Sequence, residues 1–127
     1  MNLFDGLQKL KLEGHILKYF VRNSERESTC YHEFYKGKWD GITFWKEDSL
    51  SLHDNVMFEN QGFVEAVMEV IPTYDPFGET EISIEAWQKI GQIIKEKDED
   101  SQELYKEADI WLNDVFKEYE CFTILGL

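Results

Sequence analysis

The side chains best suited to chemistry in this sequence are three histidines and two cysteines, and their spacing assembles no recognisable site. Cys30 and His32 form a C-x-H pair. The other candidates stand far apart along the chain: His15, His53 and Cys121. A zinc site needs four converging ligands, and a nucleophilic cysteine needs a base held beside its thiol. We therefore expect no metal, no cofactor and no catalytic residue, and a small enzyme using these histidines or Cys30 is the enzymatic alternative.

Motifs that bind phosphates, calcium or acyl groups are also absent from the sequence. It contains no G-x-G-x-x-G, no P-loop and no nucleophile elbow. The acid-rich KDEDSQE lacks the glycine that a calcium loop needs at its sixth position. Two cysteines are few for a small secreted domain, which favours reduced thiols, although the sequence leaves open whether Cys30 and Cys121 pair.

Acidic residues dominate the second part of the chain. The net charge of the 127 residues is −13. Residues 1–50 carry eight acids and eight bases, so the whole excess falls in residues 51–127. Such a surface repels nucleic acid and anionic membranes and attracts basic proteins. No run of about 18 apolar residues occurs, and the first residues lack the pattern of a secretory signal, although a mature form could have lost one. We therefore expect a cytoplasmic protein with a basic protein partner, bound to neither nucleic acid nor membrane.

The first part of the chain predicts mostly strands. Aromatic and branched residues alternate or cluster in short runs that turn residues separate. We expect a short helix over residues 3–10, followed by strands at Ile16–Arg22, 29–36, 42–46 and Ser49–His53. The Gly-containing segment GKWDG between the second and third of these runs predicts a hairpin.

The second part predicts helices. Residues 63–71 fit a helix or a strand, since Val-rich runs of this length suit both. Ser83 predicts the N-cap of the next helix, in which Gly91 indicates close packing. Asp100 or Ser101, with Glu103 completing a capping box, predicts the start of a last helix that ends near Tyr119. Its core face is Leu104, Ala108, Trp111, Val115 and Tyr119, with Leu112 beside them.

The order of these elements predicts one α+β domain over residues 1–127. The segment CFTIL, residues 121–125, predicts a terminal strand that returns to the sheet. We therefore expect an antiparallel sheet made from the N-terminal part and this C-terminal strand, packed against two or three helices from residues 60–119. The irregular segment PTYDPFGET connects elements within the domain.

The last helix carries its acids on one side. Four carboxylates recur at i, i+4, i+11 and i+15: Glu103, Glu107, Asp114 and Glu118. This stripe spans about 22 Å, and Ile110 occupies its vacant i+7 position. Lys106 and Lys117 are expected on another side, so they do not neutralise the stripe at i, i+4 spacing. The pattern predicts a partner-binding surface with Ile110 as its apolar anchor, unless another part of the chain covers Ile110.

The acidic stripe, the segment GETEISIEAWQKI and the lack of a catalytic motif together resemble the immunity proteins of bacterial toxin systems. The resemblance implies a small non-enzymatic inhibitor whose acidic face covers the basic active site of a toxin, such as a nuclease. The stripe residues that carry this resemblance, and that we expect to contact the partner, are Glu103, Glu107, Ile110, Asp114 and Glu118. An acidic regulatory protein or a nucleic-acid mimic is the alternative binding function.

Overall fold

The chain folds around a five-stranded antiparallel sheet with the strand order β3-β5-β4-β7-β6. The computed structural model describes residues 11–12, 15–27 and 30–126. The strands are β3 (Phe20–Arg22), β4 (Tyr31–Lys36), β5 (Leu50–His53), β6 (Glu79–Ser83) and β7 (Cys121–Leu125). A separate ribbon pairs β1 (Lys11–Leu12) with β2 (His15–Ile16), and a 3-10 turn, η1 (Asn23–Glu25), follows β3. The C-terminal strand lies between β4 and β6, so its predicted return to the antiparallel sheet is confirmed.

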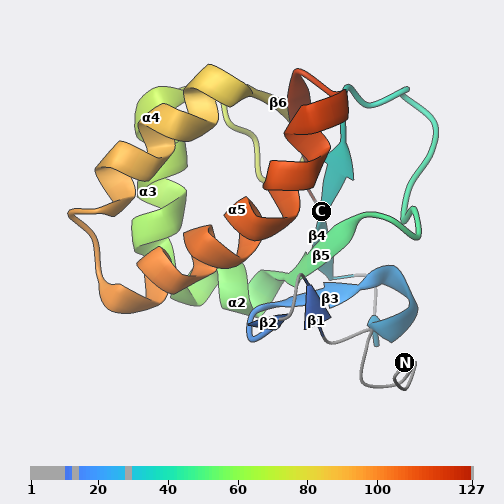
Figure 1. The fold of residues 1–127 in the computed structure, drawn as a ribbon, viewed down its shortest axis with the longest axis horizontal. Coiled ribbons are helices and arrows are strands. Elements are labelled where there is room, and N and C mark those ends of the chain that lie inside the picture. Colours follow the sequence, from blue (N-terminus) through green and yellow to red (C-terminus); the bar gives the residue numbers. More distant parts are fainter. Residues whose placement is uncertain (1–10, 13–14, 28–29, 127) are drawn as a thin grey trace.

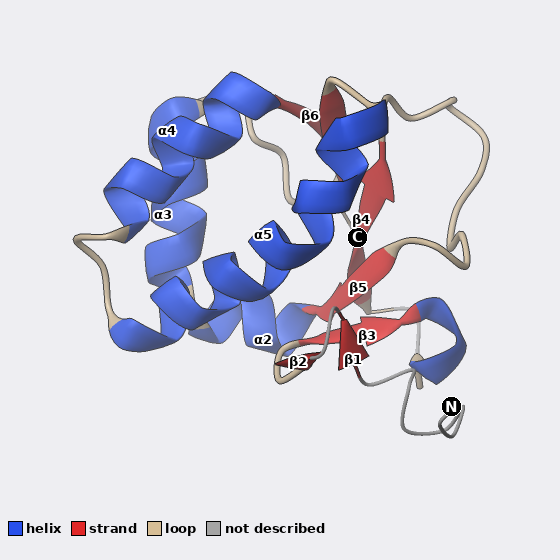
Figure 2. Cartoon of the chain, in the orientation of Figure 1, coloured by secondary structure: helices blue, strands red, loops and turns tan. Residues whose placement is uncertain are grey.

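The helices gather on one face of the sheet (Figures 1 and 2). They are α2 (Asp54–Glu59), α3 (Gln61–Val70), α4 (Ile84–Ile94) and α5 (Glu99–Glu118). Trp87 of α4 joins the two layers, since its ring centroid lies 5.4 Å from that of Phe122 of β7. Within the sheet, the Phe122 ring stacks on Phe34 of β4 with centroids 5.6 Å apart. All three side chains are buried. The predicted α+β fold is therefore confirmed, because the helices and the sheet share one core.

Residues 61–70, for which the sequence allowed helix or strand, form helix α3. Phe63, Ala66 and Val67 are buried, whereas Glu65 and Met68 are exposed. Burial at i, i+3 and i+4 is the period of a helix with one face on a core. Packing against α4 and α5 therefore decides the structure of this Val-rich segment.

The cap of α4 is as predicted, and the cap of α5 is not. Ser83 Oγ accepts a hydrogen bond from the Ala86 N–H at 3.0 Å. In α5 the cap is Asp98, whose carboxylate accepts from the Ser101 N–H at 3.1 Å. Asp100 and Ser101 instead lie in the first turn, so the predicted capping box is wrong. Asp98 has the extended backbone of a cap, and its carboxylate reaches the third residue of the helix as capping requires.

Gly91 allows α4 and α5 to pack closely, as predicted. A side-chain carbon at this position would meet the hydroxyl of Tyr105. The Tyr105 ring stacks on Trp87 with centroids 4.2 Å apart, and its hydroxyl donates to the Trp87 carbonyl at 3.0 Å. The missing Cβ therefore makes room for the aromatic pair that joins the two helices.

The predicted strand at residues 42–46 and its hairpin with β4 are wrong. These residues belong to loop 37–49, and β5 takes the place beside β4. Side-chain carboxylates accept hydrogen bonds from the backbone N–H groups that a strand would donate to its neighbour. Asp40 accepts from Ile42 and Thr43, and Glu33 accepts from residues 45 and 46. Side chains that satisfy backbone donors locally compete with a sheet ladder.

Other strand boundaries also differ from the prediction. The expected strand Ile16–Arg22 is split between β2 and β3, which belong to different sheets. Strand β6 was missed within the segment read as a connection and a helix start, although its burial alternates as an edge strand requires. The predicted helix at residues 3–10 lies outside the described residues.

Candidate partner-binding surface

Glu107 does not lie on the surface, contrary to its predicted place in the acidic stripe. Its side chain is 8% exposed. The carboxylate accepts backbone hydrogen bonds from Lys18 at 2.8 Å, Tyr19 at 2.9 Å and Phe20 at 3.0 Å. The segment that enters β3 therefore covers this part of α5. Glu107 holds that segment against the helix, and its carboxylate is not available to a partner at the predicted contact surface.

Glu103, one turn before Glu107, is exposed but bound by the same segment. Its carboxylate accepts from Lys18 Nζ at 3.2 Å and from the Tyr19 hydroxyl at 3.0 Å. The Lys18 hydrogen bond and then the Tyr19 hydrogen bond hold the pKa of Glu103 below its usual range. The N-terminal half of the stripe therefore makes contacts within the chain.

The C-terminal half of the stripe faces outward. Asp114 and Glu118 are exposed, and Ile110 is half-buried. Lys117 Nζ lies 3.2 Å from Asp114, so this lysine is closer to the stripe than its spacing predicted. Of the five predicted contact residues, Glu118 is the one that lies beside carboxylates from outside the helix.

Three carboxylates, one from β6 and two from residues 118–120, meet around a shallow hollow where α5 ends and β7 begins. Glu81 of β6, Glu118 of α5 and Glu120 line it together with Tyr119 and Lys38. Its volume is about 520 Å³, and Tyr119 is 40% exposed. We call these residues the acidic hollow. One lysine faces three carboxylates there, so the hollow has the charge that attracts a basic side chain.

Cys121 lines the same hollow, and Cys30 does not. Both residues are present as thiols, with Cys30 exposed and Cys121 half-buried. Burial first, and then the negative charge of Glu81, raises the pKa of the Cys121 thiol. A raised pKa disfavours the thiolate, so this environment does not suit a nucleophile.

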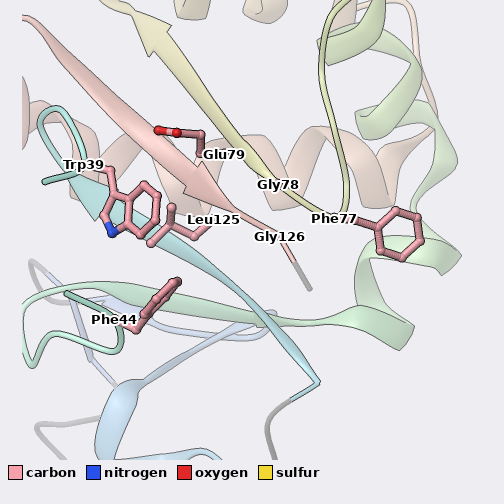
Figure 3. A pocket seen from close by; sticks show the side chains of 7 residues that line it. All are labelled: Trp39, Phe44, Phe77, Gly78, Glu79, Leu125 and Gly126. Atoms are coloured by element: carbon pink, nitrogen blue, oxygen red, sulfur yellow. The ribbon is translucent and has the colours of Figure 1, made fainter. Parts of the chain in front are cut away.

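An apolar hollow of about 350 Å³ lies at the other end of β6. Figure 3 shows Trp39, Phe44 and Leu125 converging on it, with Glu79 above Trp39 and the Phe77 ring turned away. The Trp39 and Phe44 rings lie 5.1 Å apart. We call this group the apolar hollow. Apolar side chains from a loop and a strand converge there, so the hollow is a contiguous apolar patch rather than a single exposed apolar residue.

The loop that carries half of the apolar hollow is ordered by Asp40. One carboxylate oxygen accepts from the Ile42 N–H at 2.8 Å and the Thr43 N–H at 2.7 Å. The other accepts from the Thr43 hydroxyl at 2.6 Å. These bonds, the hydroxyl bond first, lower the pKa of Asp40 to about 2. Phe44 is 52% exposed and Ile42 81% exposed on this ordered turn. Apolar side chains held in place lose little further entropy on binding.

The two histidines whose side chains the structure describes, His32 and His53, make separate contacts. His32 is buried, and its Nε2 lies 2.8 Å from a carboxylate oxygen of Asp54 in an apolar pocket. Tyr74 lines the same pocket, and burial raises its pKa to about 12. Neither His53 nor Cys30 lines this pocket. His53 Nδ1 accepts from the Asn55 N–H at 3.0 Å, which caps α2. The side chain of His15 lies outside the described residues.

Within the described part of the chain, no three His, Cys, Asp or Glu side chains are grouped as metal ligands. None of the helices described there has the length and apolar content needed to cross a membrane. Comparison of the chain with protein-family models, curated proteins and solved structures finds no match.

Sequence reasoning missed both hollows, because each is formed by residues far apart in the chain. The alternation of Glu79 and Glu81 with Thr80 and Ile82 was a local signal in the sequence for β6. Recognising that strand would have placed two exposed glutamates on the sheet. It would not have shown that α5 ends beside them.

Proposed function

We propose that this chain is a non-enzymatic protein-binding module of the cytoplasm, and that it is an immunity-type inhibitor of a basic toxin. The observation that carries the proposal is the presence of an acidic hollow and an apolar hollow at the two ends of the edge strand β6. Tight protein interfaces combine a few apolar or aromatic anchors with surrounding charge that guides the approach. This surface offers both.

The mechanism has two steps. The excess of carboxylates first attracts a basic partner, which raises the association rate. Apolar side chains of the partner then dock against Trp39, Phe44 and the exposed Tyr119. An inhibitor bound in this way would cover basic residues that a nuclease needs to hold its negatively charged substrate.

The partner is a basic toxin domain rather than a nucleic acid, since the same carboxylates repel phosphates. The test uses the product of the gene immediately upstream of the gene for this chain, which the proposal requires to contain a basic toxin domain. We expect the purified chain to inhibit that domain's activity at a one-to-one ratio, with an affinity that falls as salt rises. Calorimetry at two salt concentrations measures the binding. If a stoichiometric amount neither binds nor inhibits at low salt, the proposal is wrong.

A further inference from the structure

Strand β6 is the outer strand of the sheet on its side, and its unpaired backbone groups can be identified from its pairing with β7. The Gly126 N–H donates to the Gly78 carbonyl at 2.7 Å, and the Ile84 N–H donates to the Glu120 carbonyl at 3.3 Å. In an antiparallel pair, every second residue bonds to its partner. Glu79 and Glu81 therefore turn their backbone N–H and C=O groups away from β7.

The side chains at this edge select a basic strand over a second copy of the chain. Glu79 and Glu81 are exposed and alternate with the buried Thr80 and Ile82. Charged side chains on an edge strand are a common way to prevent pairing between identical edges. A second β6 would bring carboxylates together, whereas a strand with Lys or Arg would gain from the same residues.

Both hollows lie on the face to which these glutamates point. Glu79 is registered with Leu125 of the apolar hollow, and Ser83 with Cys121 of the acidic hollow. Four residues separate the two positions, which corresponds to about 14 Å of strand. Side chains at an even separation on an added strand point to one face.

We propose that the partner binds through an extended basic segment that pairs with β6 as a sixth strand of the sheet. An aromatic or large aliphatic residue of this segment enters the apolar hollow. A Lys or Arg four positions away enters the acidic hollow. This recognition mode rests on the proposed function, because it specifies how the basic partner is held at the same surface.

The first test uses synthetic nine-residue peptides of Thr and Val that carry one Trp and one Arg. In one pair of peptides the two residues are four positions apart, in either order; in the control pair they are three apart. We expect the better of the four-spaced peptides to bind at least about fivefold more tightly than either control. In NMR titrations of the full chain, it should shift the amide signals of Glu79 and Glu81. Equal binding of all peptides, or shifts confined to other elements, would overturn the proposal.

The second test compares Glu81→Pro with Glu81→Gln. Both remove the charge, but only proline removes the outward N–H, and an edge strand tolerates proline at such a position. Circular dichroism confirms that both variants are folded. We expect Glu81→Pro to bind the four-spaced peptide and the toxin domain at least about tenfold more weakly than Glu81→Gln. Equal affinities of the two variants would overturn strand pairing.

These tests separate the two proposals. If the unaltered chain does not bind the toxin domain, the proposed function fails, and the peptides still decide whether β6 accepts a strand. If the chain binds the toxin domain but the two Glu81 variants bind it equally, only the strand-pairing mode fails. Concentration-dependent shifts of the Glu79 and Glu81 amides without peptide would show that a second copy occupies the edge, which also contradicts the proposal.

Discussion

The two halves of helix α5 carry the same kind of residue at the same spacing and use it in opposite ways. In the N-terminal half, Glu103 and Glu107 are bound by residues 18–20 of the same chain. In the C-terminal half, Asp114 and Glu118 are exposed, and Glu118 lies in the acidic hollow with Glu120 and with Glu81 of β6. Helical spacing determines which side of a helix a residue occupies. It does not determine what else lies against that side.

The difference arises because α5 is much longer than β3, the strand whose preceding residues lie against it. Helix α5 has 20 residues, whereas β3, whose entry covers its first half, has three. The short strand and the residues before it cover only part of the acidic side. The remainder, with Asp114 and Glu118, faces solvent.

The strongest way to test this contrast is Glu107→Ala. Without this carboxylate, the N–H groups of Lys18, Tyr19 and Phe20 lose their acceptor, and the last of these groups is buried. We expect the free energy of unfolding to fall by about 1–3 kcal/mol, which is the cost of one stranded buried donor, since water replaces the acceptor for the two partly exposed donors. Urea denaturation measures the change.

The matched control for Glu107→Ala is Glu118→Ala, in the same helix and stripe. Exposed substitutions of this kind change stability by no more than about 0.5 kcal/mol. Equal losses in the two variants would show that the halves of the helix do not differ.

The contrast in α5 also explains how far the sequence predicts this molecule. The apolar periodicity of α4 and α5 and the aromatic runs of β4 and β7 are local signals, and they predicted those elements and the α+β fold. The loop that replaced a strand at residues 42–46 depends on Glu33, which lies in β4. A carboxylate that binds distant backbone donors leaves no periodic trace in the sequence. For the same reason, the spacing of Glu107 could not reveal its role.

In the exposed half, charge reversal should change binding and leave folding intact. We expect Glu118→Lys combined with Glu120→Lys to weaken binding to the toxin domain about 10- to 100-fold, mainly through slower association. The effect should shrink as salt rises, because salt screens these charges. Surface plasmon resonance at two salt concentrations measures both rates.

The control for this double variant reverses Glu59 and Glu69, two exposed acids on α2 and α3. It changes the net charge equally but lies away from the acidic hollow. If both double variants weaken binding to the same extent, net charge rather than this surface attracts the partner.

Asp40 shows a third arrangement of a carboxylate, on the surface and hydrogen-bonded to residues of its own turn. Its pKa is about 2, below the ordinary value of 3.8. A lowered pKa means that the group stabilises the fold fully above about pH 4 and that this contribution is lost as the pH falls toward 2. Trp39 Nε1 donates to the Thr43 carbonyl at 2.6 Å, so the Trp39 indole N–H signal reports on the turn.

We expect that NMR signal to move between pH 4 and pH 2 in the unaltered chain. In Asp40→Asn it should already be displaced at pH 7, since a neutral amide is a weaker acceptor. A Trp39 signal that is identical in both proteins at pH 7 would show that the turn does not depend on the carboxylate.

The smallest effect should come from Lys18→Gln, which alters the covered half of α5 without exposing it. Lys18 contributes two contacts that can be separated: its side chain donates to Glu103, and its backbone N–H donates to Glu107. The substitution removes only the first. The pKa of Glu103, which the Lys18 ammonium holds low, should therefore rise toward its usual range. A carboxyl-carbon NMR titration measures this rise.

The control is Lys117→Gln, which alters the lysine beside Asp114 and should leave the pKa of Glu103 unchanged. The backbone hydrogen bonds to Glu107 remain in Lys18→Gln, so the segment before β3 should stay in contact with the helix. This result would show that the buried carboxylate of Glu107, and not the exposed ion pair of Lys18 with Glu103, holds the segment in place.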